Sequence, residues 1–203
     1  MVSDFGRSLF LMICSLWASI GFAGTRDDFP PALSARFTVL LNAQVQELYL
    51  RRTDTQIQTA WLTSGKWALW TRSPEGEFNL QQVFMSEQRV VEYVSGELKT
   101  RRMVPDWLQF GSLVMPSMLD QARQVGHARR LGRSAIHYRG KLAGDPADLW
   151  WLPGPSLPAS FEWGRGKQAI VWQLRTITPA GTAFDEALLR DFVRMDAADL
   201  GDM

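Results

Sequence analysis

Three predicted strands follow one another in residues 148–177, DLWWLPGPSLPASFEWGRGKQAIVWQLRTI. They are expected at 148–152, 159–163 and 169–177, where polar residues alternate with apolar and β-branched ones. Gly164 and Gly166 lie between the last two strands and supply the turn of a hairpin. Alternation that leaves one face polar indicates antiparallel pairing, because parallel strands are usually apolar on both faces.

The same two-residue period runs through most of the chain before this passage. It begins at Gln56, and the turn formers of residues 64–66 and 73–77 divide it into hairpins. Further strands are predicted at 78–84, 89–94, 99–103 and 134–138. The sequence therefore predicts an α+β domain built on one curved antiparallel sheet, a half-barrel of about seven to ten strands wrapped over one or two helices.

Three segments depart from this period. Residues 33–48 place apolar side chains three and four apart, which predicts an amphipathic helix beginning near Ser34; a strand over 38–49 is the alternative. Residues 106–124 are apolar but interrupted by proline and glycine, which predicts one or two short helices or a packed loop over the sheet. A last helix is predicted over 184–195.

The N-terminus has the pattern of a secretory signal. Arg7 precedes an apolar run that closes on the small residues Gly21 and Ala23. A retained membrane anchor is the alternative, since the run is near the lower length limit for crossing a bilayer. The expected organisation is a signal peptide at 1–23, a linker at 24–32, a single domain at 33–195 and an acidic tail at 196–203. The protein is therefore expected in the periplasm.

Composition excludes several kinds of chemistry. The chain has 22 Lys and Arg, 21 Asp and Glu, and a formal net charge of +1, which argues against nucleic-acid binding. Its single cysteine, Cys14, lies inside the predicted signal, so the mature chain has no thiol for a disulfide, a nucleophile or a metal. No cofactor, metal site or catalytic set is predicted. A hydrolase that uses His137 with a nearby acid is a minor alternative.

The order of the predicted elements resembles the periplasmic lipoprotein-carrier superfamily. The resemblance is strongest in residues 148–163 and 170–177, where a strand with tryptophans runs through a proline-containing turn into two further strands. It covers residues 33–180 and implies an incompletely closed antiparallel sheet around helices, with an apolar concavity for acyl chains. It also implies an arginine near the mouth of the concavity, which the sequence does not assign to one residue.

Aromatic residues supply the expected ligand contacts. Adjacent Trp150 and Trp151 must point to opposite faces if they lie in a strand, and large rings either fill a core or line a groove. Arginine pairs at strand ends keep sheet edges soluble, or gather at the mouth and attract lipid phosphates or an acidic partner. The expected ligand contacts are Trp61, Trp70, Trp107, Phe110, Met115, Trp150 and Trp172, and the expected rim is Arg51, Arg101 and Arg102.

Residues 107–115 have two interpretations. They either cover the concavity as a lid or complete the core. As part of a lid, Trp107→Ala should cost less than about 2 kcal/mol of stability, whereas truncation of a core tryptophan costs about 3 to 5 kcal/mol.

The function expected from these features is that of a non-catalytic periplasmic binding or carrier protein. Its ligand would be apolar, namely a lipid, an acyl chain or a lipoprotein, and the protein would be a monomer with peripheral membrane contact. The alternative is an envelope assembly or regulatory module that acts through protein contacts, with residues 106–124 or the acidic tail as its surface.

Overall fold

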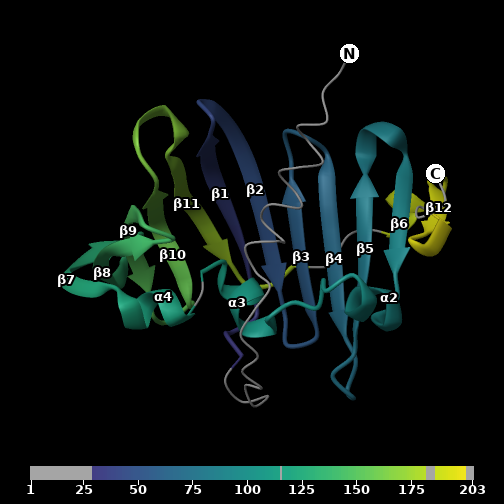
Figure 1. Cartoon of the computed structure of the whole chain (residues 1–203), viewed down its shortest axis with the longest axis horizontal. Coiled ribbons are helices and arrows are strands. Elements are labelled where there is room, and N and C mark those ends of the chain that lie inside the picture. The colour runs from purple at the N-terminus through teal and green to yellow at the C-terminus, as the bar shows by residue number, and fades with distance from the viewer. Residues whose placement is uncertain (1–28, 115, 182–185, 200–203) are drawn as a thin grey trace.

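The computed structural model describes residues 29–114, 116–181 and 186–199. A single twelve-stranded sheet dominates it, and three short α-helices lie on one side (Figure 1). The spatial order of the strands is β12-β6-β5-β4-β3-β2-β1-β11-β10-β9-β8-β7. Every neighbouring pair is antiparallel except β12 with β6. The predicted class, an α+β fold with an open curved antiparallel sheet, is confirmed.

The first half of the chain supplies one side of the sheet and the second half the other, and the C-terminal strand joins the first half. The strands are β1 (Leu33–Leu41), β2 (Gln44–Arg52), β3 (Gln56–Trp61), β4 (Lys66–Arg72), β5 (Phe78–Phe84), β6 (Arg89–Tyr93), β7 (Arg123–Arg130), β8 (Arg133–Leu142), β9 (Asp145–Leu152), β10 (Leu157–Trp163), β11 (Ile170–Thr178) and β12 (Val193–Asp196). The helices are α2 (Ser95–Thr100), α3 (Trp107–Ser112) and α4 (Pro116–Gln121), with 3-10 helices at Met85–Glu87, Gly166–Gln168 and Glu186–Leu189.

The predicted helix over 33–48 is wrong, because this segment forms β1 and most of β2. Asn42 and Ala43 have φ of 50° and 61°, the conformation of a tight two-residue hairpin turn. Alternate residues of β1 are buried. One of them is Ala35, whose small side chain gives little sign of a buried position when the segment is interpreted as a helix. The apolar residues three and four apart are compatible with a helix and with a strand. Pairing with β2 and β11 decides in favour of the strand.

Other segments also differ from the prediction, and the unexpected strands β1, β2, β7 and β12 raise the strand count above the seven to ten expected. Residues 99–103 were expected as a strand, but α2 continues through Thr100, and the Glu97 side chain accepts a hydrogen bond from the Val94 amide at its start. β7 was not predicted, since RQVGHARR is mostly polar. The helix expected over 184–195 lies partly outside the described residues, and its described part forms a 3-10 turn and β12.

The two faces of the sheet have different environments. On the helix side, the main apolar cluster joins β1–β5 and β8–β11 to residues of α2 and α3, such as Leu98 and Trp107. A second cluster there packs Val114 and Leu119 over Trp151 and Phe161. On the opposite face, Leu189 and Phe192 cover Val83 and Val90. Register shifts within β1, β7 and β10 add local twist, which suits a curved sheet.

Helix α3 is held close to the sheet at the centre of the helix side (Figure 1). Asp106 caps its first turn by accepting a hydrogen bond from the Gln109 amide, 3.0 Å away. Gly111 has no side chain, and a Cβ there would lie 2.8 Å from the Phe29 ring. Glycine therefore lets the helix approach Phe29. No helix among the described residues is long and apolar enough to cross a membrane.

Trp107 is 7% exposed and packs between aromatic rings, so the structure favours the core interpretation over the lid. We predict that Trp107→Ala lowers the free energy of unfolding by about 3 to 5 kcal/mol in denaturant melts. The control is Val104→Ala, at a side chain that is 43% exposed, and it should change stability by less than about 0.5 kcal/mol. A loss below about 2 kcal/mol for Trp107→Ala would restore the lid interpretation.

Candidate functional site

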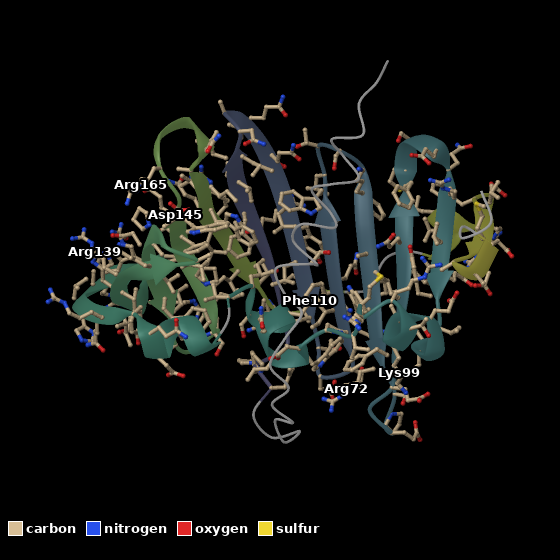
Figure 2. All side chains as sticks on the ribbon, in the orientation of Figure 1. Arg72, Lys99, Phe110, Arg139, Asp145 and Arg165 are labelled. Carbon is tan, nitrogen blue, oxygen red and sulfur yellow. The ribbon has the colours of Figure 1, made fainter. Side chains whose placement is uncertain are left out.

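Aromatic rings gather where α3 meets the helix side of β3, β4 and β5. Trp107 stacks on Phe29 with ring centroids 5.8 Å apart and tilts against Phe78 at 5.4 Å. Phe110, on the same helix, meets Trp70 edge to face at 5.5 Å (Figure 2). We call these five residues the α3 aromatic cluster. Ring pairs in such geometries add to the stabilisation from buried area alone.

The two ends of the Trp107 indole have different roles. Its ring is buried among Phe29 and Phe78, while its N–H donates to the backbone carbonyl of Asp54, 3.1 Å away in the β2–β3 turn. That hydrogen bond fixes where the start of α3 sits on the sheet. Phe110 is only half-buried, so it is the member of the pair on α3 that retains an accessible surface.

The structure brings most of the predicted ligand contacts together. Trp61, Trp70, Trp107, Phe110 and Trp172 belong to the main apolar cluster or pack against it. Trp61 and Trp172 are half-buried, and Trp172 also joins the second cluster under α4. Met115 lies outside the described residues. Trp150 also packs against the main cluster, and its ring stacks on His137.

Trp150 and Trp151 point to opposite faces, as strand geometry requires. Trp151 is 8% exposed and packs with Val114 on the helix side. The Trp150 ring stacks on His137, with centroids 4.2 Å apart and an interplanar angle of 9°, and the Arg130 guanidinium lies 4.4 Å from its centroid. Trp150 is therefore covered by basic side chains, while Trp151 belongs to the core.

Arg52 is the buried cation of the helix side. It follows Leu48 and Leu50 on the inward positions of β2, and its exposure is 0%. The guanidinium donates to four backbone carbonyls from three separate segments: Pro31 before β1 at 3.1 Å, Gly111 in α3, and Pro155 and Ser156 in the β9–β10 turn, the last at 3.2 Å. We call this arrangement the Arg52 latch. It ties α3 to both halves of the sheet.

Burial lowers the pKa of Arg52 to about 9, because the charged guanidinium is removed from water. Within the described residues no carboxylate pairs with it. Since the pKa remains above neutral, the side chain is charged at physiological pH and is balanced by carbonyl dipoles alone. Such an arrangement is stable only while all three segments stay in place.

The three predicted rim arginines have different surroundings. Arg51 is 8% exposed and donates to the Gly181 carbonyl at 2.7 Å and to Gln56 at 3.1 Å. Arg101 donates to the Ala197 carbonyl at 2.7 Å and lies over the Tyr93 ring. Arg102 is exposed. Arg101 is exposed as well, and a rim role for these residues stays a prediction.

A surface pocket of about 280 Å³ lies where the chain turns after β11. It is lined by Ser34, Ala35, Arg36, Tyr49, Thr176, Thr178, Pro179 and Gly181. The Ser34 hydroxyl accepts from the Gly181 amide at 3.3 Å and lies 3.0 Å from the Tyr49 hydroxyl. None of the predicted ligand contacts lines this pocket.

His137 in β8 and Asp148 in β9 form an acid–base pair. His137 Nε2 lies 2.8 Å from Asp148 Oδ1, and Arg139 Nε donates to Asp148 Oδ2 at 2.7 Å. Partial burial alone would raise the pKa of Asp148, but the hydrogen bonds and charges of Arg139 and His137 outweigh it and lower that pKa. The hydrolase alternative needs an acid near His137, and Asp148 fulfils that condition. If His137→Ala leaves a hydrolytic activity intact, that alternative fails.

Among the described residues, no group of three or more His, Cys, Asp or Glu side chains is placed to hold a metal ion.

Comparison with known proteins gives distant similarities of structure. No protein-family model matches the sequence, and no curated protein matches it. MucB is similar over 93% of this chain and 63% of its own, with 12% identity and a TM-score of 0.47. PNGF-II is similar over 85% of this chain, with 7% identity and a TM-score of 0.46. This chain spans only 32% of PNGF-II.

A domain assigned to outer membrane lipoprotein sorting, from Vibrio parahaemolyticus, is also similar. The match covers 81% of this chain and 94% of that domain, with 9% identity and a TM-score of 0.33.

Arg52 is the residue of this site that the sequence analysis did not identify. The signal was present, since an arginine two positions after Leu50 and four after Leu48 lies on the apolar face of a strand. The helical interpretation of residues 33–48 concealed it. An arginine on a buried face must find acceptors, and backbone carbonyls at the helix and turn provide them.

We predict that Arg52→Met lowers the free energy of unfolding by about 2 to 4 kcal/mol, because it leaves buried carbonyls without a donor. Arg52→Lys should recover only part of the loss, since an ammonium cannot reproduce the planar fork of a guanidinium. Arg36→Met, an exposed position on the neighbouring strand, is the matched control. Equal stability of Arg52→Met and wild type in denaturant melts would show that the latch is not structural.

We predict a modest pH dependence from Asp148. The pKa of Asp148 is lowered in the folded state. Its contribution to the free energy of unfolding is therefore present above the ordinary carboxyl pKa and is lost as the pH falls through the lowered value. Because the carboxylate is partly exposed, the difference between wild type and Asp148→Asn should stay below about 1 kcal/mol at neutral pH. Thermal melts should show this difference shrinking in acid, and a difference that grows in acid would contradict the assignment.

Proposed function

We propose that this protein is a non-catalytic periplasmic binding or carrier protein that takes an apolar ligand, a lipid or acyl chain, on the helix side of its sheet. The observation that supports it best is the accessible apolar surface of that face: Trp61, Phe110 and Trp172 stay half-buried there, beside the fixed helix α3.

The chemistry of the face suits acyl chains. It carries half-buried Trp61, Phe110 and Trp172 beside fully buried aliphatic residues. Ligand sites of this kind are mostly apolar, with few polar groups.

The proposed location follows from the sequence. The apolar run that ends at Ala23 has the pattern of an export signal, and the chain after it has no cysteine. An apolar ligand would need a carrier in an aqueous compartment between membranes. The resemblance to lipoprotein carriers in residues 148–177 supports the same proposal, with a lipoprotein acyl group as one form of the ligand.

Native mass spectrometry of protein purified from a bacterial envelope tests the proposal. A bound lipid-sized mass, together with binding of fluorescent fatty acids in solution, is the expected result. Protein that emerges without ligand and ignores fluorescent fatty acids would refute the lipid version.

Phe110→Ala provides a residue-level test. We predict that it weakens fluorescent fatty-acid binding by on the order of tenfold, because a half-buried ring that contacts ligand is lost. Leu62→Ala, at a side chain that is 40% exposed in the β3–β4 turn, is the control and should bind as wild type does. Unchanged affinity of a folded Phe110→Ala protein would remove Phe110 from the site.

A protein-contact function is the second candidate, and the C-terminal segment supports it. Leu188 and Val193 are 58% and 63% exposed, although Leu189 between them is buried and Ala197 is 0% exposed. Deletion of residues 185–203 would therefore disturb the fold. The better test is Leu188→Ser with Val193→Ser, which should abolish capture of a defined envelope partner while the protein stays folded.

A further inference from the structure

The β7–β8 hairpin concentrates positive charge at one end of the sheet. Residues 123–144 contain six Lys and Arg and no Asp or Glu. Since the whole chain carries +1, all its other residues together carry −5. The six cations are Arg123, Arg129, Arg130, Arg133, Arg139 and Lys141.

Strand register places five of these six cations on the same face. Residues directly opposite in an antiparallel pair share a face, and Arg123 lies opposite Arg139 while Arg130 lies opposite Arg133. The two-residue period of β8 adds Lys141 to that face. All five side chains are exposed. We call Arg123, Arg130, Arg133, Arg139 and Lys141 the cationic face; Figure 2 shows Arg139 at this end of the molecule.

The charge of the cationic face is only slightly neutralised by the protein itself. Among the described residues, Arg139 is the member of the set that forms an ion pair, with Asp148. Asp148 also binds His137, and Glu162 lies opposite Asp148 one strand further in. The hairpin therefore presents a field that attracts anions.

The shape of the cationic face indicates a flat partner. β7 is the last strand of the sheet, so an added acidic strand would lie in the sheet plane and meet mainly the side chains of β7. Three of the five cations, Arg133, Arg139 and Lys141, belong to β8. From Arg133 to Lys141 the row extends about 27 Å along the strand. An extended anionic plane can contact both strands at once.

An apolar residue lies at the tip of the same hairpin. Leu131 has φ of 51° in the β7–β8 turn and is 52% exposed, between Arg130 and Arg133 in the chain. Arginines with an exposed leucine between them suit the boundary between lipid phosphates and acyl chains. A soluble acidic polypeptide would give Leu131 no comparable environment.

We propose that the cationic face docks this protein onto an anionic phospholipid bilayer, with arginine and lysine contacting lipid phosphates and Leu131 entering the headgroup region. The five residues of the cationic face are not among the proposed ligand contacts, so the docking proposal does not depend on the apolar ligand site. The two proposals can fail separately.

The test is co-sedimentation of the full protein with vesicles of phosphatidylglycerol and phosphatidylethanolamine, compared with phosphatidylcholine vesicles. We expect binding only to the anionic vesicles, weakening steadily as salt is raised. Each cation near an anionic surface contributes about fivefold in affinity, so the combination Arg123→Gln, Arg133→Gln and Lys141→Gln should weaken binding by on the order of 100-fold.

The matched control is the combination Arg36→Gln, Arg175→Gln and Arg190→Gln, which removes the same charge from exposed positions elsewhere. The affinity of this control variant for the anionic vesicles should stay within about threefold of wild type, since the cationic face is intact. Absence of binding by wild type at low salt, or equal loss in both triple variants, would overturn the proposal. So would preferential binding of an acidic peptide that β7 substitutions alone abolish, which would assign the surface to a polypeptide.

Discussion

The rest of the structure depends on where the buried guanidinium of Arg52 finds its acceptors. One side chain donates to carbonyls before β1, in α3 and in the β9–β10 turn, segments that are up to 125 residues apart in sequence, from Pro31 to Ser156. Pairing of β1 with β11 joins the two halves of the sheet along its middle. The Arg52 latch adds a polar connection across the helix side, and burial of its charge lowers the pKa of Arg52 to about 9.

With α3 fixed in this way, the sheet separates two kinds of surface. The helix side is apolar and aromatic, with Phe110 as the accessible ring on α3. The opposite face at β7–β9 is basic, with Trp150 enclosed by His137 and Arg130. Trp150 lies between them, because it packs against the main apolar cluster and also contacts His137 and Arg130. A ligand site and a docking surface can therefore coexist in one domain without sharing residues.

The sequence predicted the fold where alternation and turn residues agreed, as in residues 56–61, 78–84 and 148–177. It failed where local pattern was ambiguous or uninformative. Residues 33–48 satisfy both helical and strand spacing, and only pairing with β11, far away in the chain, decides between them. β7 has a polar sequence and exists as a partner of β8. Most of the predicted aromatic ligand contacts lie in or against the main apolar cluster. The burial of Arg52 was not predicted, because most of its strand, β2, was interpreted as part of a helix.

The most direct test of this account is hydrogen exchange at the backbone amide of Phe110, which donates to the Asp106 carbonyl within α3. If the Arg52 latch holds α3 on the sheet, Arg52→Met should speed exchange at Phe110 by about tenfold or more, while the Phe37 amide in the central strand β1 exchanges as in wild type. Unchanged exchange at Phe110, or equal acceleration at Phe37, would contradict the account.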